Sequence, residues 1–390
     1  MKILLAIILR EFKNFYKNKI LFCVVLFCPL ILAFVLGGIF SNRVVIKMPV
    51  AVLDADQSKL SRMIMRNLEA SRSFTIKYHV ESPEHIQSLI YQQEIILGLV
   101  IPKHLWRDIK RGNVATVTAF VDGSNLLTVN LALADLKVLI ATISAGIKLK
   151  FLQKIGSNES RGLALIQTIK TDISKLYNPG FNYLHYMAPG IWIAVLHQII
   201  LLLGSLLIVS EIENKTFSEF LNLSNHRWYL IIAGKLIPPF LISLLFFDIY
   251  FRVIFPLFAI QFKGSIPLMV LISALFSLCT LSLGLVISLW AERSLDAIKG
   301  VLLIGSPAFI LSGYTWPTNN MPLFIQPISY ALPLTPYLRG LRKVFQQGGS
   351  WENIYGDSLI LILMTGTFLL ISVLMLQKRI RYIERIERGA

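Results

Sequence analysis

Residues 211–235 read EIENKTFSEFLNLSNHRWYLIIAGK, a polar stretch of mixed charge between two long apolar segments. The segment before it reads GIWIAVLHQIILLLGSLLIVS, and the segment after it reads LIPPFLISLLFFDIY. Lipid offers no hydrogen-bond partners to the backbone of a loop, so this stretch must emerge into water. Phe217, Phe220, Leu221 and Leu223 fall on one side of a helix. The spacing predicts a short amphipathic helix at the membrane surface that docks into a partner; a simple solvated connection is the alternative.

The composition of the 390 residues is that of an integral membrane protein. Hydrophobic residues make up 55% of the chain, charged residues only 15%, and the mean hydropathy is +0.65. These values lie outside the range of soluble domains. The net charge of +16 would suggest nucleic acid for a soluble chain. Here the basic residues cluster beside apolar segments, where anionic lipid and the positive-inside rule account for them. We therefore expect membrane lipid, and no nucleic acid, among the partners.

Residues 1–40 predict an amphipathic elbow helix followed by the first transmembrane span. Basic residues alternate with apolar ones at helical spacing up to Lys19. Residues 20–40 are then long enough to cross the hydrocarbon core. A cleaved signal peptide is the alternative, but no clean cleavage site follows, so we expect a retained anchor.

Residues 41–182 have the composition of a globular domain and predict an extracytoplasmic α/β domain with a helical stalk. Segments typical of strands occur at 49–55, 73–80, 96–102 and 114–123, and helical patterns separate them. This alternation predicts a sheet covered by helices. Helical patterns at 126–154 and 162–175 are interpreted as the stalk. Asp54 and Asp56 precede a predicted helix, so helix capping explains them better than a cation site or acid–base chemistry.

Residues 183–377 predict five further spans, separated by the polar loop 210–230 and by a proline-rich region at 314–350. The spans are expected at 184–209, 229–258, 266–290, 300–313 and 354–376. Five prolines in 314–350 exclude a straight helix, so this region is predicted to be a re-entrant outer segment of broken helices held against protein. Residues 378–390 form a basic tail that we expect in the cytosol.

The distribution of Lys and Arg beside the spans predicts the topology. Fifteen lie on the side of the two termini and four on the other side, leaving out the large domain. The asymmetry places both termini in the cytosol. The expected fold is an α-helical membrane protein with six transmembrane helices and an α/β extracytoplasmic domain inserted between the first and second spans.

Motifs for catalysis or metal binding do not occur in the sequence. There is no G-x-x-x-x-G-K-[ST] phosphate loop, no H-E-x-x-H, no G-x-S-x-G and no C-x-x-C. Cys23, Cys28 and Cys279 all lie in apolar segments and imply no disulfide framework. We therefore predict no catalytic residue, no metal site and no cofactor bound by this chain.

Three stretches in this order resemble one family. They are EIENKT (211–216) with GKL (234–236), LSGYTWPTNNMP (311–322) followed by PLTPYLRGLR, and PVAVLDADQSKLSR near residue 50. Together they resemble the bacterial type-2 ABC transporter permeases with a large extracytoplasmic domain, a class often connected with multidrug efflux. In that family the inner loop commonly reads E-x-E-x-G-T followed by an acidic residue. The matching residues here are Glu211, Glu213, Thr216 and Glu219, and Lys215 stands where the family usually has Gly.

The resemblance implies a permease subunit in the bacterial inner membrane that moves hydrophobic or amphiphilic, drug-like compounds out of the cytoplasm or the inner leaflet. A separate cytosolic ABC ATPase would bind ATP and magnesium, and Glu211, Glu213, Thr216 and Glu219 would couple to it. The permease would form a homodimer or heterodimer, and a periplasmic adaptor could join it. Export of a glycolipid, a polysaccharide or ions is one alternative. A membrane-anchored scaffold, whose extracytoplasmic domain is the working part, is another.

Five residues near the spans are candidates for a translocation path: Trp192, Asp248, Arg252, Tyr314 and Trp316. Asp248 and Arg252 are spaced i, i+4 in the third span, so they share a helical face and can neutralise each other. Charges at membrane depth usually mark function, although an anchor near the outer headgroups is the alternative. The aromatic residues suit apolar substrates, but interfacial belts explain them equally well.

Overall fold

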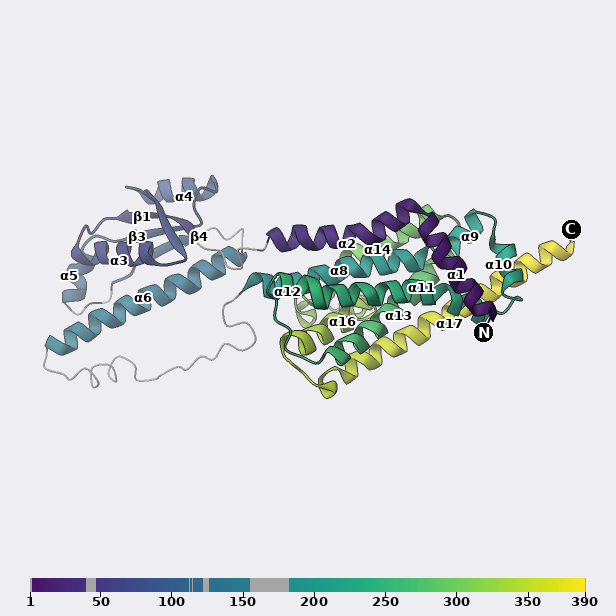
Figure 1. Ribbon diagram of the computed structural model, residues 1–390. Coiled ribbons are helices and arrows are strands. Elements are labelled where there is room, and N and C mark those ends of the chain that lie inside the picture. Colours follow the sequence, from purple (N-terminus) through teal and green to yellow (C-terminus); the bar gives the residue numbers. More distant parts are fainter. Residues whose placement is uncertain are drawn as a thin grey trace. The chain divides into compact units, whose positions relative to one another are not determined.

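The computed structural model describes residues 2–39, 47–111, 113, 115–121, 126–154 and 182–389 (Figure 1). The chain divides into two compact units, Met1–Arg43 with Leu176–Ala390, and Val44–Lys175. The stalk segment predicted at 162–175 lies outside the described residues.

The unit Val44–Lys175 is built on a four-stranded sheet. Its strands are β1 (Met48–Asp54), β2 (Phe74–His79), β3 (Leu97–Ile101) and β4 (Thr118–Val121). The strand order is β2-β1-β3-β4, with β1 parallel to both neighbours and β4 antiparallel to β3. The four predicted strands are all present, and their alternation with helices gives the expected α/β arrangement.

Helices cover both faces of this sheet. On one face, α3 (Lys59–Ala70), α5 (Leu105–Lys110) and α6 (Leu126–Lys154) share an apolar core with β1 and β3. On the other face, α4 (Pro83–Tyr91) packs so closely that a Cβ added at Gly98 would lie 2.1 Å from Ile86 Cγ2. Burial on both faces explains why β1 and β3 are apolar along their length.

The acidic residues after β1 accept hydrogen bonds from backbone N–H groups, but neither caps α3, so the predicted capping of that helix by Asp54 and Asp56 is wrong. Asp54 accepts hydrogen bonds from the backbone N–H groups of Asp56 and Gln57, at 3.1 and 2.9 Å. The N-cap of α3 is Ser58, and Asp56 instead accepts a bond from Trp106 N at the start of α5, at 3.2 Å. Each carboxylate therefore satisfies backbone donors at a chain reversal or a helix start.

Seven helices in the described residues are long and apolar enough to cross a membrane. They are Lys19–Ile39, Thr128–Leu149, Tyr183–Ser205, Trp228–Leu257, Ile266–Trp290, Ser294–Leu311 and Trp351–Arg381. Six coincide with predicted spans. The additional one, Thr128–Leu149, lies in α6, where Ala132 and Leu136 pack in the core of the sheet domain. Sequence reasoning interpreted this segment as a stalk, but its buried contacts make it a wall of that core.

The other unit is a helical bundle. Its long helices are α1 (Lys2–Lys17), α2 (Lys19–Ile39), α8 (Tyr183–Ser205), α11 (Trp228–Ile249), α13 (Ile266–Trp290), α14 (Ser294–Leu311) and α17 (Trp351–Gly389). The fifth predicted span begins at Ser294 rather than at Gly300 and so reaches 18 residues. After α11 the chain continues as a π-helix, η1 (Tyr250–Ile254), and α12 (Phe255–Leu257). The predicted basic tail continues the helix of α17.

The centre of the bundle depends on close contact between α8 and α13. A Cβ added at Gly284 would lie 2.7 Å from Gly204 Cα and 2.9 Å from the carbonyl oxygen of Leu201. The two backbones therefore touch where both helices carry glycine, as small residues permit in membrane helix pairs.

The proline-rich region forms short pieces: η2 (Thr318–Asn320), α15 (Gln326–Tyr330), α16 (Leu334–Leu341) and η3 (Arg342–Gln346). In α16, Tyr337 is fully buried, its ring stacks on Phe276 with centroids 4.2 Å apart, and its hydroxyl hydrogen-bonds to Ser273 at 2.9 Å. Asp357 of α17 is paired with Arg339 and Lys343. Broken helices held against protein were expected here, and these contacts hold them.

One end of the bundle collects several segments that are far apart in sequence. In Figure 1 the N-terminus, α9 (Val209–Glu213), α10 (Phe217–Leu223) and the end of α17 lie at the same end of this unit, whereas α12 and α16 lie towards the other. The polar loop 210–230 therefore shares its end of the bundle with both chain termini.

Candidate coupling site

The polar loop 210–230 folds into two short helices, α9 and α10, each closed by a Schellman motif. After α9, Thr216 N donates to Glu211 O at 2.9 Å and Lys215 N donates to Ile212 O at 3.1 Å. Lys215 adopts the left-handed conformation, with φ of 58°. Glycine adopts this conformation without strain. The glycine that the family resemblance implies at this position would fit the turn, and Lys215 forms the same turn.

The first turn of α9 is fixed from another helix. Ser288 of α13 is fully buried, and its hydroxyl accepts hydrogen bonds from Ile208 N at 2.8 Å and Val209 N at 3.0 Å. These donors have no partner within α9, since the first N–H groups of any helix are unsatisfied. Ser288 thus takes the place of an N-cap side chain.

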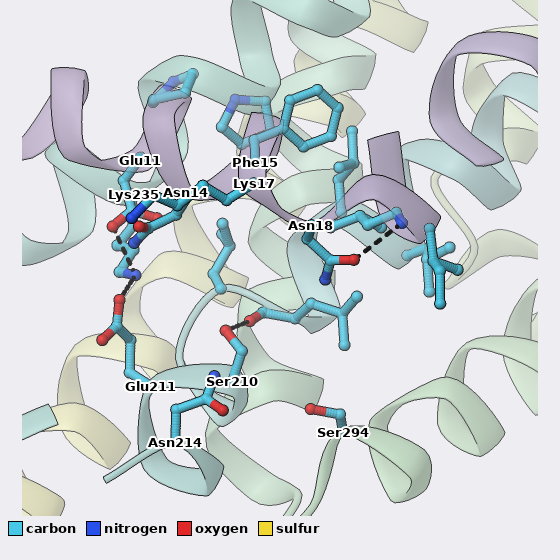
Figure 2. A pocket seen from close by; sticks show the side chains of 18 of the residues that line it. Glu11, Asn14, Phe15, Lys17, Asn18, Ser210, Glu211, Asn214, Lys235 and Ser294 are labelled. Carbon is cyan, nitrogen blue, oxygen red and sulfur yellow. Dashed lines mark hydrogen bonds and ion pairs between the residues drawn. The ribbon is translucent and has the colours of Figure 1, made fainter. Parts of the chain in front are cut away.

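Glu211 belongs to a largely buried cluster of four charges (Figure 2). Arg10 Nη1 and Nη2 donate to the two carboxylate oxygens of Glu211 at 2.8 and 2.9 Å, and Lys235 Nζ donates to Oε1 at 2.8 Å. The Thr216 hydroxyl donates to Oε2. Lys235 also pairs with Glu11 at 2.8 Å. The two cations and two anions balance, so the cluster ties α9 to both α1 and α11.

Burial and pairing act in opposite directions on Glu211, whose side chain is only 5% exposed. Burial disfavours the carboxylate, but the hydrogen bond from Arg10 and the charge of Lys235 outweigh it and lower the pKa to about 2. The charged form therefore persists at neutral pH. A bidentate Arg–carboxylate pair also fixes orientation, because both groups are planar.

Phe220 of α10 closes the cluster on one side. Its ring centroid lies 4.7 Å from Lys235 Nζ and 5.1 Å from Arg10 Cζ, both within cation–π range. Phe217, Phe220 and Leu221 are all buried. The apolar side of α10 thus packs inward on its own chain. The prediction that this side docks into a partner is wrong for these three residues, and only Leu223 remains exposed.

The remaining acidic residues of the loop have different environments. Glu213 is exposed, and its carboxylate accepts a hydrogen bond from Ser294 N at 3.1 Å, at the start of α14. This bond to Ser294 lowers the pKa of Glu213. Glu219 is exposed on the outer side of α10, beside Asn222 and Leu223. The structure therefore brings Glu211 and Thr216 together inside, uses Glu213 to bridge α9 and α14, and presents Glu219 outward.

A cavity of about 800 Å³ lies next to the charge cluster. Figure 2 shows side chains of α1 on one side of the cavity, facing Ser210 and Glu211 of α9, Asn214 just after α9, and Ser294 of α14. The cluster therefore forms one wall of this cavity.

Comparison with known proteins identifies the family. The model of the family described as "ABC-2 family transporter protein" matches residues 19–374. The chain belongs to the ABC-2 transporter family. The match includes the charged residues of α9 and α11 and the whole loop between them, whereas Arg10 and Glu11 precede it.

Curated ABC-2 relatives resemble the chain over most of its length. "Probable multidrug ABC transporter permease YbhR" of Escherichia coli K12 is 24% identical over 349 residues, which is 88% of this chain and 90% of the relative. YbhS of the same strain, with the same description, is 24% identical over 96% of this chain and 97% of the relative. "Linearmycin resistance permease protein LnrN" of Bacillus subtilis 168 is 24% identical over 93% of this chain and 96% of the relative.

Membership in this family establishes the kind of molecule. ABC-2 chains such as these relatives are permease subunits, which lack an ATPase motif of their own and work with an ATPase subunit. The apolar helices agree with a multi-pass membrane protein. The chain is thus a transmembrane permease of an ABC transporter and not an enzyme.

The five path candidates of this ABC-2 permease lie in separate environments, and none of them lines the cavity. Asp248 and Arg252 form the expected ion pair, but their side chains are 51% and 63% exposed on the surface of the single chain. Trp316 is also exposed, at 55%. Trp192 is fully buried and Tyr314 nearly so.

The two buried aromatic candidates belong to the interior of the bundle. Trp192 stacks on Phe255, with ring centroids 5.4 Å apart. Tyr314 and Tyr186 each donate a hydroxyl hydrogen bond to the other's backbone carbonyl. Arg342 covers the Tyr314 ring at 4.5 Å. These contacts hold the proline-rich region against α8 within one chain.

Sequence reasoning missed the partners of Glu211. Arg10 and Glu11 were interpreted only as part of an amphipathic elbow, and Lys235 only as part of a family pattern. A signal was available, because Ile7 and Arg10–Glu11 follow one another at i, i+3/i+4 on one helix face. That face packs on α11, where a Cβ added at Gly234 would lie 2.4 Å from Ile7 Cγ2.

Proposed function

We propose that this chain is the membrane-spanning permease subunit of an ATP-driven exporter that moves hydrophobic or amphiphilic, drug-like compounds out of the cytoplasm or the inner leaflet. A separate cytosolic ABC ATPase powers it and holds the ATP and magnesium. Relatives named for multidrug transport and for linearmycin resistance support this substrate class.

The arrangement of the coupling site carries the proposal. Glu211 anchors α9 to α1 and α11 through buried charges, while Glu219, Asn222 and Leu223 remain exposed on the next helix. A surface element rigidly joined to two bundle helices can transmit a displacement imposed from outside. A solvated connection without function needs neither the buried charges nor the bridge from Glu213 to Ser294.

The rest of the assembly follows from the same proposal. The end of the bundle with α9, α10 and both termini faces the cytosol, the bundle crosses the inner membrane six times, and residues 41–182 lie outside it. Two permeases, identical or similar, pair around the path. Of the five candidates, the exposed residues Asp248, Arg252 and Trp316 contribute to the path, whereas Trp192 and Tyr314 lie in the interior of one chain. A periplasmic adaptor contacts the outer domain. The scaffold alternative is not favoured, because the family match extends through the helices of the bundle.

The test is co-purification of the chain with its genomic neighbours in mild detergent. We expect an ATPase subunit with a phosphate loop to accompany it, and ATP hydrolysis to rise with apolar compounds. Glu219→Lys reverses one exposed charge on α10 and is expected to weaken the association about tenfold, the effect of about 1.4 kcal/mol at an interface.

The matched control is Glu352→Lys, which reverses an exposed charge in the first turn of α17. It should leave the association unchanged, because α17 begins at the opposite end of the bundle (Figure 1). Failure of any phosphate-loop protein to associate contradicts the exporter role. Equal association of both variants contradicts docking through α10 alone.

A further inference from the structure

The cavity beside the charge cluster has both polar and apolar lining. Its polar lining comes mainly from α1 and α9 and includes Asn14, Lys17, Asn18 and Glu211. Its apolar lining comes from α2, α8, α11 and α14, and includes Leu21, Val24, Leu203 and the adjacent prolines Pro238 and Pro239. A space with both kinds of lining can hold a molecule with a headgroup and a tail.

The charged residues of the lining include one cation in excess. Arg10 and Lys235 are neutralised by Glu11 and Glu211 within the cluster. Lys17 also lines the cavity, and it forms no ion pair in the part of the chain that the structure describes. The lining therefore carries an excess of one positive charge, which favours an anionic headgroup.

The cavity lining includes exposed apolar residues beside the bend between α1 and α2. α1 ends at Lys17 and α2 begins at Lys19, and the Asn18 side chain accepts a hydrogen bond from Leu21 N at 3.1 Å. Just after this bend, Ile20 is 80% exposed and Val24 is 38% exposed. An amphipathic helix that leads into a span lies at the level of the headgroups, so we expect these residues at the boundary between headgroups and acyl chains.

We propose that this cavity binds one anionic phospholipid of the surrounding bilayer. The phosphate lies near Lys17, Asn14 and Asn18, and the upper part of an acyl chain lies along Val24 and Pro239. The volume is within the range of ligand sites in proteins, roughly 300–1,000 Å³. The proposal goes beyond export, since it requires only that the chain lie in a membrane. The lipid would be wedged between the elbow and the helices joined by Glu211.

Photolabelling of the full-length chain without any ATPase tests this binding. The chain is reconstituted in phosphatidylcholine vesicles that contain a little phosphatidylglycerol with a diazirine high on one acyl chain. After irradiation and digestion, we expect label concentrated on peptides around residues 14–24 and 238–242. Unlabelled phosphatidylglycerol should compete, whereas glycerol phosphate should not, because it lacks the tail.

Two pairs of variants separate the site from general lipid contact. Lys17→Glu should lower the labelling about fivefold or more, the effect of one to two charges near a membrane surface. Lys13→Glu, on the same helix but outside the cavity lining, should not. Val24→Trp should exclude the acyl chain, and Ile31→Trp, two turns along α2 and exposed, should not. Lys17→Gln serves as a milder second variant.

Three outcomes would overturn the proposal. They are labelling spread evenly over the lipid-exposed helices, labelling unchanged in both Lys17 variants, and competition by glycerol phosphate, which would indicate a small-anion site. The labelling of a variant is compared with that of the wild type only if both have the same unfolding midpoint and the same gel-filtration profile. This condition excludes misfolding as the cause of a loss of labelling. Because no ATPase is present, failure here is distinct from failure of the export proposal.

Discussion

Arg10 and Glu211 are 201 positions apart in the sequence, yet the guanidinium of Arg10 donates to both carboxylate oxygens of Glu211. This pair joins α1 to α9, the first short helix of the loop 210–230 that we propose contacts the ATPase. In that proposal, a displacement of α9 would act on α1 through Arg10 and on α11 through Lys235.

Replacing Glu211 with Gln should destabilise the bundle. The change keeps the shape but leaves the buried Lys235 and the partly buried Arg10 with only Glu11 as a counter-charge, and breaking a buried pair costs about 3 kcal/mol. Thermal unfolding in detergent measures the loss. Glu219→Gln is the control, because Glu219 is exposed and should change the midpoint little. Equal midpoints for the two variants would contradict the buried cluster.

The lowered pKa of Glu211 predicts that the stability of the fold depends on pH. The pKa of Glu211 is lowered from 4.5 to about 2 in the folded chain, so its contribution to stability is complete above about pH 4.5 and is lost as the pH falls towards 2. The contribution is about 3 kcal/mol. The difference in midpoint between wild type and Glu211→Gln should therefore shrink over this window, and a constant difference would argue against a charged Glu211.

Lys215→Gly should stabilise the turn after α9. A non-glycine residue with φ of 58° carries backbone strain of about 1 kcal/mol, which glycine relieves. The expected result is a higher unfolding midpoint with unchanged ATPase association. Lys13→Gly, in the middle of α1, should have the opposite sign, because glycine inside a helix costs about 1 kcal/mol. The same sign for both variants would refute the turn geometry.

Gly284→Ala should separate α8 from α13. The new methyl group would meet the backbone of Gly204 and Leu201 at less than 3 Å, and neither backbone can move without shifting a helix. A loss of about 2 kcal/mol is expected. Gly366→Ala in α17 is the matched control, since its Cβ meets nothing within 4 Å, and it should be neutral or slightly stabilising.

Cysteine labelling checks the orientation of the bundle. In a background without Cys23, Cys28 and Cys279, Asn225→Cys after α10 should react only from the cytosol. Ser350→Cys, before α17, should react only from the outside, because a thiol reagent that cannot cross the membrane reaches only one end of the bundle. Both positions are exposed. Labelling of both from the same side would overturn the six-span topology.

Much of the fold follows from local patterns. The strands around Val50 and Leu99, the spans of α8, α11 and α13, and the broken helices around Pro333 follow from runs and breaks within a few residues. These features depend on local hydrophobicity and on backbone donors that proline lacks. The loop could also be recognised from a local pattern, because Glu211 and Thr216 belong to one short motif of six residues.

The partners within the site could not be predicted in the same way. Arg10, Glu211 and Lys235 converge only after α1 packs on α11, and that contact depends on Gly234 admitting Ile7. The pattern of α10 likewise showed an apolar side but not what covers it. A single sequence shows from its spacing that a helix has an apolar side. Which segment covers that side depends on packing between residues that are far apart in the chain.

The cap that Ser288 provides means that a free peptide with the sequence of the loop would not keep its structure. Helices of five and seven residues are too short to persist in water by themselves. Here a hydroxyl from α13 supplies the cap, and cations from α1 and α11 hold Glu211. A free peptide copying residues 208–224 would lose all of these and unfold, so it would compete poorly for the ATPase. A peptide inhibitor that copies this loop would need a covalent cross-link to hold its two helices in place of the contacts with the bundle.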